Sequence, residues 1–113
     1  MIEINLYTYR AKVTSVYDGD TLTADIDLGF SVVLRDQRVR LARINAPETR
    51  GAGAEMGVKS RDALRAQVLG KTVVLRTTKD SREKYGRWLA EVWVDDKCVN
   101  DWLLSEGLAA KYT

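Results

Sequence analysis

Apolar and polar residues alternate through much of the first half of the chain, as they do in strands with one buried face. The alternation is cleanest over residues 21–27 and weaker over residues 4–17, and the Asp18-Gly19 pair between them predicts a hairpin turn. A third strand is predicted over residues 31–44. Arg43 falls on its apolar parity, so we expect a bulge or a strand end near that residue.

The second half of the chain changes to a helical spacing. Residues 55–69 predict an amphipathic helix that stops at Gly70. A short last helix is predicted over residues 99–106, where apolar residues recur at i, i+3 and i+4. The face of the longer helix that we expect to be buried consists of Met56, Ala63, Leu64 and Val68.

Two more strands complete the pattern. Residues 72–78 and 88–94 are strand-like, and a polar turn over residues 79–86 joins them. The order is then three strands, a helix, two strands and a short helix. This order predicts a mainly β protein with some α (α+β), compatible with a five-stranded OB-fold barrel. Because there is no internal repeat and no linker, we expect a single domain over residues 1–113.

Composition excludes several kinds of protein. Cys98 is the only cysteine, so the chain forms neither an intrachain disulfide nor a cysteine-rich zinc site. We expect Cys98 to be buried, and the three tryptophans, Trp88, Trp93 and Trp102, to lie in the core. The first residues lack the pattern of a secretory leader, and no apolar run approaches the ~20 residues of a membrane span. We therefore expect a soluble monomer, which this sequence would place in the cytoplasm. The mature form of a secreted protein would have the same sequence features.

The charge of the chain is small overall but uneven. The formal net charge is +2, yet five arginines fall within residues 35–50. A local basic field of this kind can attract a polyanion. These residues are Arg35, Arg38, Arg40, Arg43 and Arg50.

Four short segments carry residue types that together suit a metal-dependent phosphodiesterase site. Such a reaction needs cations that shield the phosphate and a base that activates water. Arg40 and Arg87 suit the phosphate, because a guanidinium donates two parallel hydrogen bonds and stays charged. Taken singly, Arg40 would be a solvated strand residue and Arg87 a turn charge. The segments are Asp18-Gly19-Asp20-Thr21, Arg40, Asn45-Ala46-Pro47-Glu48-Thr49 and Lys84-Tyr85-Gly86-Arg87.

Asp20 is the candidate cation ligand of the first segment, because a carboxylate beside backbone carbonyls holds a hard cation through oxygen. Asn45 and the Ala46 carbonyl are the other candidate ligands, and one Ca²⁺ ion is the expected cofactor. The alternatives are structural. In them, Asp20 only caps its turn and Asn45 is an ordinary turn residue.

Glu48 is the candidate general base, because the chain has no histidine and water must be activated by a carboxylate, a metal-bound hydroxide or both. The alternative is a loop carboxylate paired with Arg50. Lys84, Tyr85 and Tyr112 are candidate substrate contacts, since a tyrosine can donate to a phosphate or stack on a base. Lys84 taken alone would be an ordinary surface lysine.

These segments, in this order and at these distances, resemble the staphylococcal nuclease (thermonuclease) family over residues 13–109. Val99-Asn100 and Glu106-Gly107-Leu108-Ala109 extend the resemblance. The resemblance implies an OB-fold barrel and calcium-dependent hydrolysis of DNA and RNA that leaves 3′-phosphate ends. It also implies that Asp20 and the Ala46 carbonyl bind calcium and that Glu48 positions or deprotonates the water. Arg40 and Arg87 would then bind the phosphate, and Tyr85 would contact the nucleotide.

Two departures from the family pattern change what we expect. Asn45 stands where the best-known members have an aspartate that binds calcium, so we expect weaker calcium binding or a changed metal preference. The sequence ends at Tyr112-Thr113, where longer members continue into a helix with further tyrosines, and weaker substrate binding would result. The rival interpretation is a catalytically silent barrel that binds single-stranded nucleic acid or a protein partner. Such a barrel has no need of two carboxylates and two arginines together, so we favour the enzyme.

Overall fold

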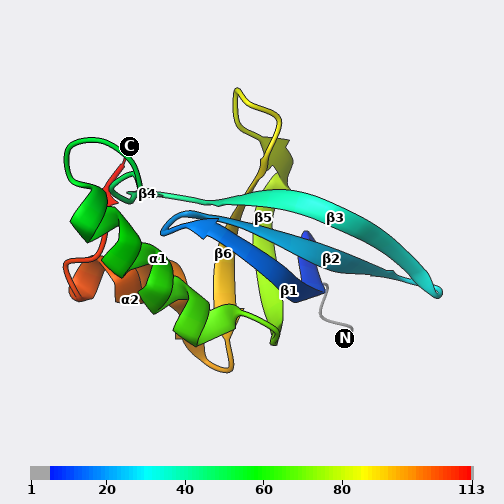
Figure 1. Ribbon diagram of the computed structural model, residues 1–113. Coiled ribbons are helices and arrows are strands. Elements are labelled where there is room, and N and C mark those ends of the chain that lie inside the picture. Colours follow the sequence, from blue (N-terminus) through cyan, green and yellow to red (C-terminus); the bar gives the residue numbers. More distant parts are fainter. Residues whose placement is uncertain (1–5, 113) are drawn as a thin grey trace.

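Five long strands curl into a closed barrel, which confirms the expected mainly β fold (Figure 1). The computed structural model describes residues 6–112, and the expected start of the first strand at residue 4 lies outside them. The strands lie in the order β3-β2-β1-β5-β6, and a parallel pairing of β3 with β6 closes the barrel. They are β1 (Thr8–Asp18), β2 (Thr21–Gly29), β3 (Val32–Leu41), β5 (Thr72–Arg82) and β6 (Trp88–Val94).

Local signals in the sequence set the strand ends. Asp18 pairs with Thr21 across the β1–β2 turn, as the Asp-Gly pair predicts. Arg43 has a φ of +69° and separates β3 from the next strand, which confirms the expected strand end. β5 was expected to end at residue 78 but continues to Arg82, because Arg82 still pairs with Trp88 after a register shift.

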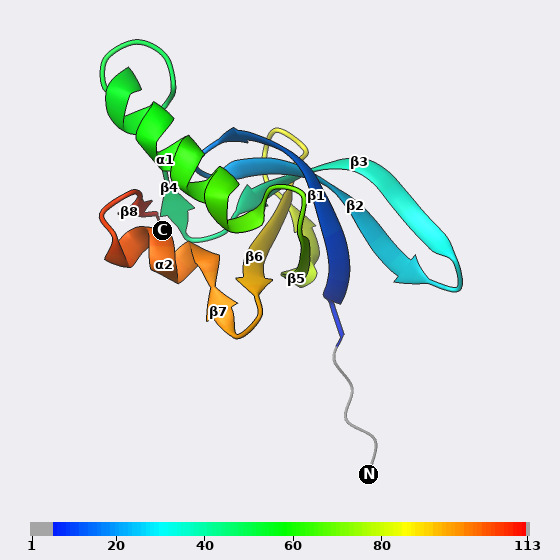
Figure 2. The same cartoon turned by 60° about the horizontal axis from the view of Figure 1, so that its bottom comes forward.

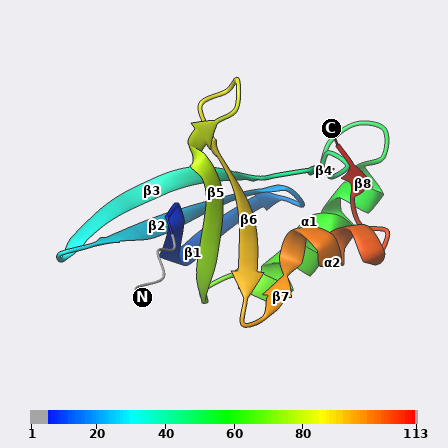
Figure 3. The ribbon, with the colours of Figure 1, turned by 180° about the vertical axis from the view of Figure 1, so that it is seen from behind.

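Three two-residue strands were not expected, because so short a segment has no periodicity. β4 (Ile44–Asn45) pairs with β8 (Ala110–Lys111), and β7 (Lys97–Cys98) pairs antiparallel with the end of β6. The β4–β8 pair brings the C-terminal segment beside the end of β3 (Figure 3).

Helix α1 (Ala54–Val68) lies across one end of the barrel and packs against β1 and α2 (Val99–Ser105) (Figure 2). Both helices match their expected bounds to within one residue. The buried face of α1 is different at its N-terminal half, where Gly57 and Ser60 are buried and Met56 is exposed. The Met56 prediction was wrong because the helix meets loop backbone there. A Cβ on Gly57 would lie 1.9 Å from the Glu48 carbonyl oxygen, so only glycine fits.

The core fills the barrel and the space beneath α1. Cys98 is buried, as expected. Trp88 and Trp102 pack against the core from partly exposed positions. Trp93 does not belong to the core, because its side chain lies on the face of β6 opposite to the buried Ala90 and Val92. No helix among residues 6–112 is long and apolar enough to cross a membrane. The largest fully buried side chains include Leu22, Leu41, Ile44, Leu64, Leu75 and Leu103.

Candidate active site

One pocket contains every site residue that the sequence singles out. It has a volume of about 530 Å³ and opens between the β1–β2 turn, the β3–β4 segment, the β5–β6 turn and the end of β8. Barrel closure and the β4–β8 pair bring these distant segments together. The predicted residues that line the pocket are Asp20, Arg40, Asn45, Ala46, Glu48, Lys84, Tyr85, Arg87 and Tyr112.

Asp20 is buried and connects three segments. Its Oδ2 atom accepts a hydrogen bond from the Ala46 N–H at 2.8 Å, and its Oδ1 atom accepts one from the Thr21 hydroxyl at 3.1 Å. Its backbone carbonyl accepts the Leu41 N–H at 2.8 Å. The carboxylate that caps the turn is that of Asp18, which accepts the Asp20 N–H at 3.1 Å. Asp20 therefore does more than cap its own turn.

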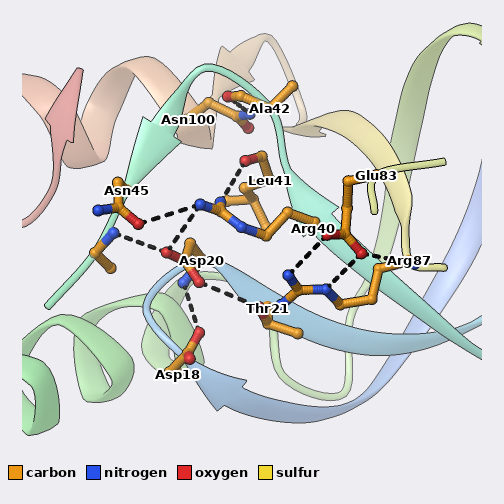
Figure 4. A network of polar contacts seen from close by, with 11 residues as sticks. Asp18, Asp20, Thr21, Arg40, Leu41, Ala42, Asn45, Glu83, Arg87 and Asn100 are labelled. Atoms are coloured by element: carbon orange, nitrogen blue, oxygen red, sulfur yellow. Dashed lines mark hydrogen bonds and ion pairs between the residues drawn. The ribbon is translucent and has the colours of Figure 1, made fainter. Parts of the chain in front are cut away.

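Arg40 extends from β3 toward Asp20 and Asn45 (Figure 4). Its Nη2 atom lies 3.4 Å from Asp20 Oδ2 and donates to Asn45 Oδ1 at 3.3 Å. Its Nη1 atom donates to the Leu41 carbonyl at 2.8 Å. The side chain is only 11% exposed, so Arg40 is not a solvated strand residue. Its charge is fixed beside the buried carboxylate.

Arg87 follows the β5–β6 turn and is held by Glu83. Its Nε atom donates to Glu83 Oε1 at 2.9 Å and its Nη2 atom donates to Oε2 at 3.1 Å, which makes a bidentate ion pair. The hydrogen bonds from Arg87 lower the pKa of Glu83 to about 2, and Glu83 in turn raises the pKa of Arg87. Arg87 is therefore oriented, unlike a free turn charge.

Thr21 links the two arginines into one network (Figure 4). Arg87 Nη1 donates to the Thr21 hydroxyl oxygen at 3.0 Å, and that hydroxyl donates to Asp20. Sequence reasoning gave Thr21 no role and overlooked Glu83. The available signal for Glu83 was its opposite charge four residues before Arg87.

Glu48 is exposed on the loop after β4 and lines the pocket. Among residues 6–112 its carboxylate makes no ion pair, and the alternative pairing with Arg50 is therefore not observed. The loop is supported by α1, which approaches Glu48 at Gly57. A Cβ on Gly19 would likewise lie 2.7 Å from the Ser60 Cβ. α1 thus contacts both loops that carry the candidate carboxylates.

Two exposed tyrosines flank the two arginines. Arg87 and Lys84 lie 5.5 Å and 5.0 Å from the centre of the Tyr85 ring. Arg40 lies 5.9 Å from the centre of the Tyr112 ring, which β8 carries to the pocket. Exposed rings beside cations suit the stacking of bases whose phosphates bind the arginines.

The donor atoms near Asp20 fit a hard divalent cation in type. They are oxygens of carboxylate, amide and backbone groups, with no imidazole or thiolate that would favour zinc. In the described part of the chain, no three His, Cys, Asp or Glu side chains are grouped closely enough to hold a metal. A cation site here would therefore depend on the Asn45 amide and the Ala46 carbonyl. The pKa of the Asp18 carboxyl group is raised to about 6. The largest cause is its burial, followed by its hydrogen bond with Asp20 and the negative charge of Asp20.

Comparison with known proteins points to one family. Residues 38–113 match the family model described as staphylococcal nuclease homologue. The chain is 34% identical to a thermonuclease of Staphylococcus intermedius over 100 residues, and 32% identical to a thermonuclease of Staphylococcus hyicus over 108 residues. It is also 34% identical over 101 residues to an uncharacterized endonuclease of Haemophilus influenzae.

The matches cover most of this chain and about half of each relative. The two thermonuclease matches span 86% and 93% of this chain, and 56% and 59% of those proteins. The Haemophilus match spans 89% of this chain and 51% of the relative. The family model begins before Arg40 and includes Glu48 and Arg87. This chain belongs to the staphylococcal nuclease family.

Proposed function

We propose that this chain is a nuclease that hydrolyses phosphodiester bonds of DNA and RNA with one Ca²⁺ ion and leaves 3′-phosphate ends. The observation that carries the proposal is the network of Arg40, Asp20, Thr21 and Arg87 in one pocket, which the exposed Glu48 also lines. Membership of a family whose relatives include thermonucleases and an endonuclease supports the reaction class.

The two arginines would hold the scissile phosphate. Arg40 is fixed by three acceptors and Arg87 by Glu83 and Thr21, so little side-chain freedom would be lost when a phosphate binds. Both side chains are mostly buried, and charge–charge interactions are stronger there than in water. Their charges would also stabilise the extra negative charge of the pentacoordinate transition state.

Glu48 would take a proton from the attacking water. Its side chain is exposed and lines the same pocket as the two arginines, and glutamate can act as a general base when no histidine is present. The water oxygen would bond to phosphorus as the bond to the 5′ oxygen breaks. The 5′ oxygen would take a proton from solvent and leave as a hydroxyl group, and the phosphate would stay on the 3′ end. Lys84, Tyr85 and Tyr112 would contact the neighbouring nucleotides.

Asp20, the Asn45 amide oxygen and the Ala46 carbonyl would hold the cation. A bound Ca²⁺ ion supplies charge neutralisation and Lewis acidity at the phosphate. Asn45 is neutral, so the protein contributes less negative charge than an aspartate at that position would. We therefore propose a weak calcium site.

The decisive experiment follows the degradation of single-stranded DNA and RNA with calcium and with calcium chelated. Wild type is expected to degrade both only with calcium. Glu48→Gln is expected to lower turnover by about 10²-fold or more with little change in binding, because a base acts in the transition state. Glu106→Gln, a change at another exposed glutamate, is the matched control and should be fully active.

The outcomes separate the enzyme from its rival. Equal turnover in wild type and Glu48→Gln would remove Glu48 from the mechanism. Intact substrate that still shifts in a binding gel would overturn the proposed nuclease in favour of a silent nucleic-acid-binding barrel. End-labelling of the products tests the position of the phosphate.

A further inference from the structure

The hydroxyl group of Thr21 joins Arg87 to the barrel. Thr21 is the first residue of β2, and its side chain is buried. Its oxygen accepts a hydrogen bond from Arg87 Nη1 at 3.0 Å, and its proton is donated to Asp20 Oδ1 at 3.1 Å. The direction of both bonds is fixed, because a guanidinium only donates and an ionised carboxylate only accepts.

The other partners of the Arg87 guanidinium belong to its own turn. Glu83 accepts hydrogen bonds from Nε and Nη2, and the Tyr85 ring lies beside the guanidinium. Both residues lie with Arg87 between β5 and β6, on a segment that projects from the barrel (Figure 1). These contacts hold Arg87 within the turn. Among residues 6–112, the hydrogen bond to Thr21 is the one that joins the guanidinium to a barrel strand.

Thr21 is itself fixed next to Arg40. The two residues are partners across the β2–β3 ladder. A threonine side chain has few rotamers because it is branched at Cβ, and burial restricts Thr21 further. Two guanidinium groups cannot hydrogen-bond to each other, since both only donate, so an acceptor must stand between them to relate one to the other. Thr21 supplies that acceptor from a position beside Arg40.

Other attachments of the turn do not replace this hydrogen bond. Trp88 Nε1 donates to Gln37 Oε1 at 2.9 Å, but that contact holds the base of the turn rather than the guanidinium. The negative charge of Asp20 also attracts Arg87. Attraction between charges has little preferred direction, whereas a hydrogen bond weakens steeply as its angle departs from linear. The orientation of Arg87 relative to the barrel therefore depends on Thr21.

We propose that Thr21 is a positioning residue whose hydroxyl group sets the Arg87 guanidinium against Arg40 and Asp20, so that both arginines reach the same phosphate. Thr21 is not among the residues that line the pocket, so it acts through Arg87 rather than on substrate. Its effect on turnover rests on the proposed nuclease function, whereas the placement of Arg87 does not. A displaced arginine would stabilise the transition state less well.

The first test needs neither substrate nor calcium. Nuclear magnetic relaxation of the Arg87 Nε–H group measures the order of the side chain, and its resonance is identified by its loss in Arg87→Lys. Thr21→Val removes the hydroxyl group at nearly the same shape, and the order parameter should fall clearly below the roughly 0.85 of a rigid group. Thr21→Ser keeps the hydroxyl group and should preserve the order. Thr23→Val, on the same face of β2 and outside the pocket, is the matched control and should change nothing.

The second test is turnover of single-stranded DNA with calcium. Thr21→Val should lower kcat about 10²-fold, because a misplaced reacting group has that effect. KM should rise no more than about threefold, and Thr21→Ser should stay within about threefold of wild type in both constants. When Arg87→Ala is already present, adding Thr21→Val should lower kcat no further, because a residue that acts through Arg87 then has nothing to position.

Two outcomes would overturn the positioning role. One is an Arg87 order parameter that is the same in wild type and in Thr21→Val, whatever the activity. The other is an equal loss of turnover from Thr21→Val with and without Arg87, since Thr21 would then act independently of it. If wild type degrades no nucleic acid while the order parameter falls as expected, the proposed nuclease fails and the placement of Arg87 by Thr21 stands.

Discussion

Glycine residues set how closely α1 can approach the two loops that carry Asp20 and Glu48. A Cβ on Gly57 would overlap the Glu48 backbone, and a Cβ on Gly19 would crowd Ser60 on α1. Neither Gly19 nor Gly57 has a positive φ, so backbone conformation does not explain why glycine stands at these positions. Their role is close packing, and packed loops hold the carboxylates in fixed positions.

Gly57→Ala should therefore lower turnover about 10²-fold without unfolding the protein, because a shift of about 1 Å at a reacting group has that effect. Alanine favours a helix, so α1 itself should be preserved. The measurement is kcat on single-stranded DNA together with far-UV circular dichroism. Val58→Ala, at the neighbouring exposed helix position, is the control. Full turnover in Gly57→Ala would show that the Glu48 loop can move aside freely.

Asn45→Asp tests the cation site through binding. The change adds a negative charge next to Asp20, on a side chain that already faces Arg40. Calcium affinity is expected to rise about tenfold, because charge count tunes calcium sites. Calorimetry measures it, with Gln67→Glu as the control that adds the same charge on α1. If the affinity is unchanged, residue 45 is not a ligand.

At the scale of elements, the β5–β6 turn fixes the position of the Arg87 side chain. Glu83 and Arg87 stand at its two sides and form the bidentate pair, and the Glu83 N–H also bonds to the Arg87 carbonyl at 2.9 Å. The turn thus fixes Arg87 before substrate binds. A phosphate that binds Arg87 must share it with Glu83.

Glu83→Gln should reveal this pair through the pH dependence of stability. The pKa of Glu83 is lowered from 4.5 to about 2, so its contribution is present above pH 4.5 and is lost as the pH falls toward 2. Wild type should be more stable than Glu83→Gln by about 1 kcal/mol at pH 7, with the gap closing in acid. Urea denaturation at pH 7, 5, 4 and 3 measures the gap. A gap that does not change with pH would mean that the ion pair contributes nothing.

The sequence predicts long elements well and short or non-periodic ones poorly. β2 and α1 were predicted because their periods repeat, whereas β4 and β8 are two residues each and form only because they pair with one another. Met56 was misplaced because helical periodicity does not reveal that loop backbone packs on α1. The candidate site residues were proposed from their chemistry, and the fold places them around one pocket. Thr21 and Glu83 became evident only from their contacts with Arg87.

At the scale of the whole molecule, the lining of the candidate site comes from segments far apart in the sequence. The β1–β2 turn carries Asp20 near the N-terminus, and β8 carries Tyr112 to the same pocket from the C-terminus. The Tyr112 N–H donates to the Arg43 carbonyl at 2.9 Å, which continues the pairing of β8 with the β3–β4 segment. The pocket is therefore complete only when the barrel is closed and β8 is paired.

Tyr112→Ala should weaken substrate binding while leaving the chemistry and the fold intact. The ring is exposed beside Arg40, and stacking of a base on an aromatic ring contributes about 1–3 kcal/mol. KM for single-stranded DNA should rise about tenfold with kcat nearly unchanged, because the ring would contact substrate equally in the ground and transition states. Tyr17→Ala removes another exposed tyrosine, outside the pocket, and should leave KM unaltered. If kcat falls instead and KM stays constant, Tyr112 acts by orienting Arg40, and the C-terminal strand belongs to the catalytic machinery more directly than stacking alone implies.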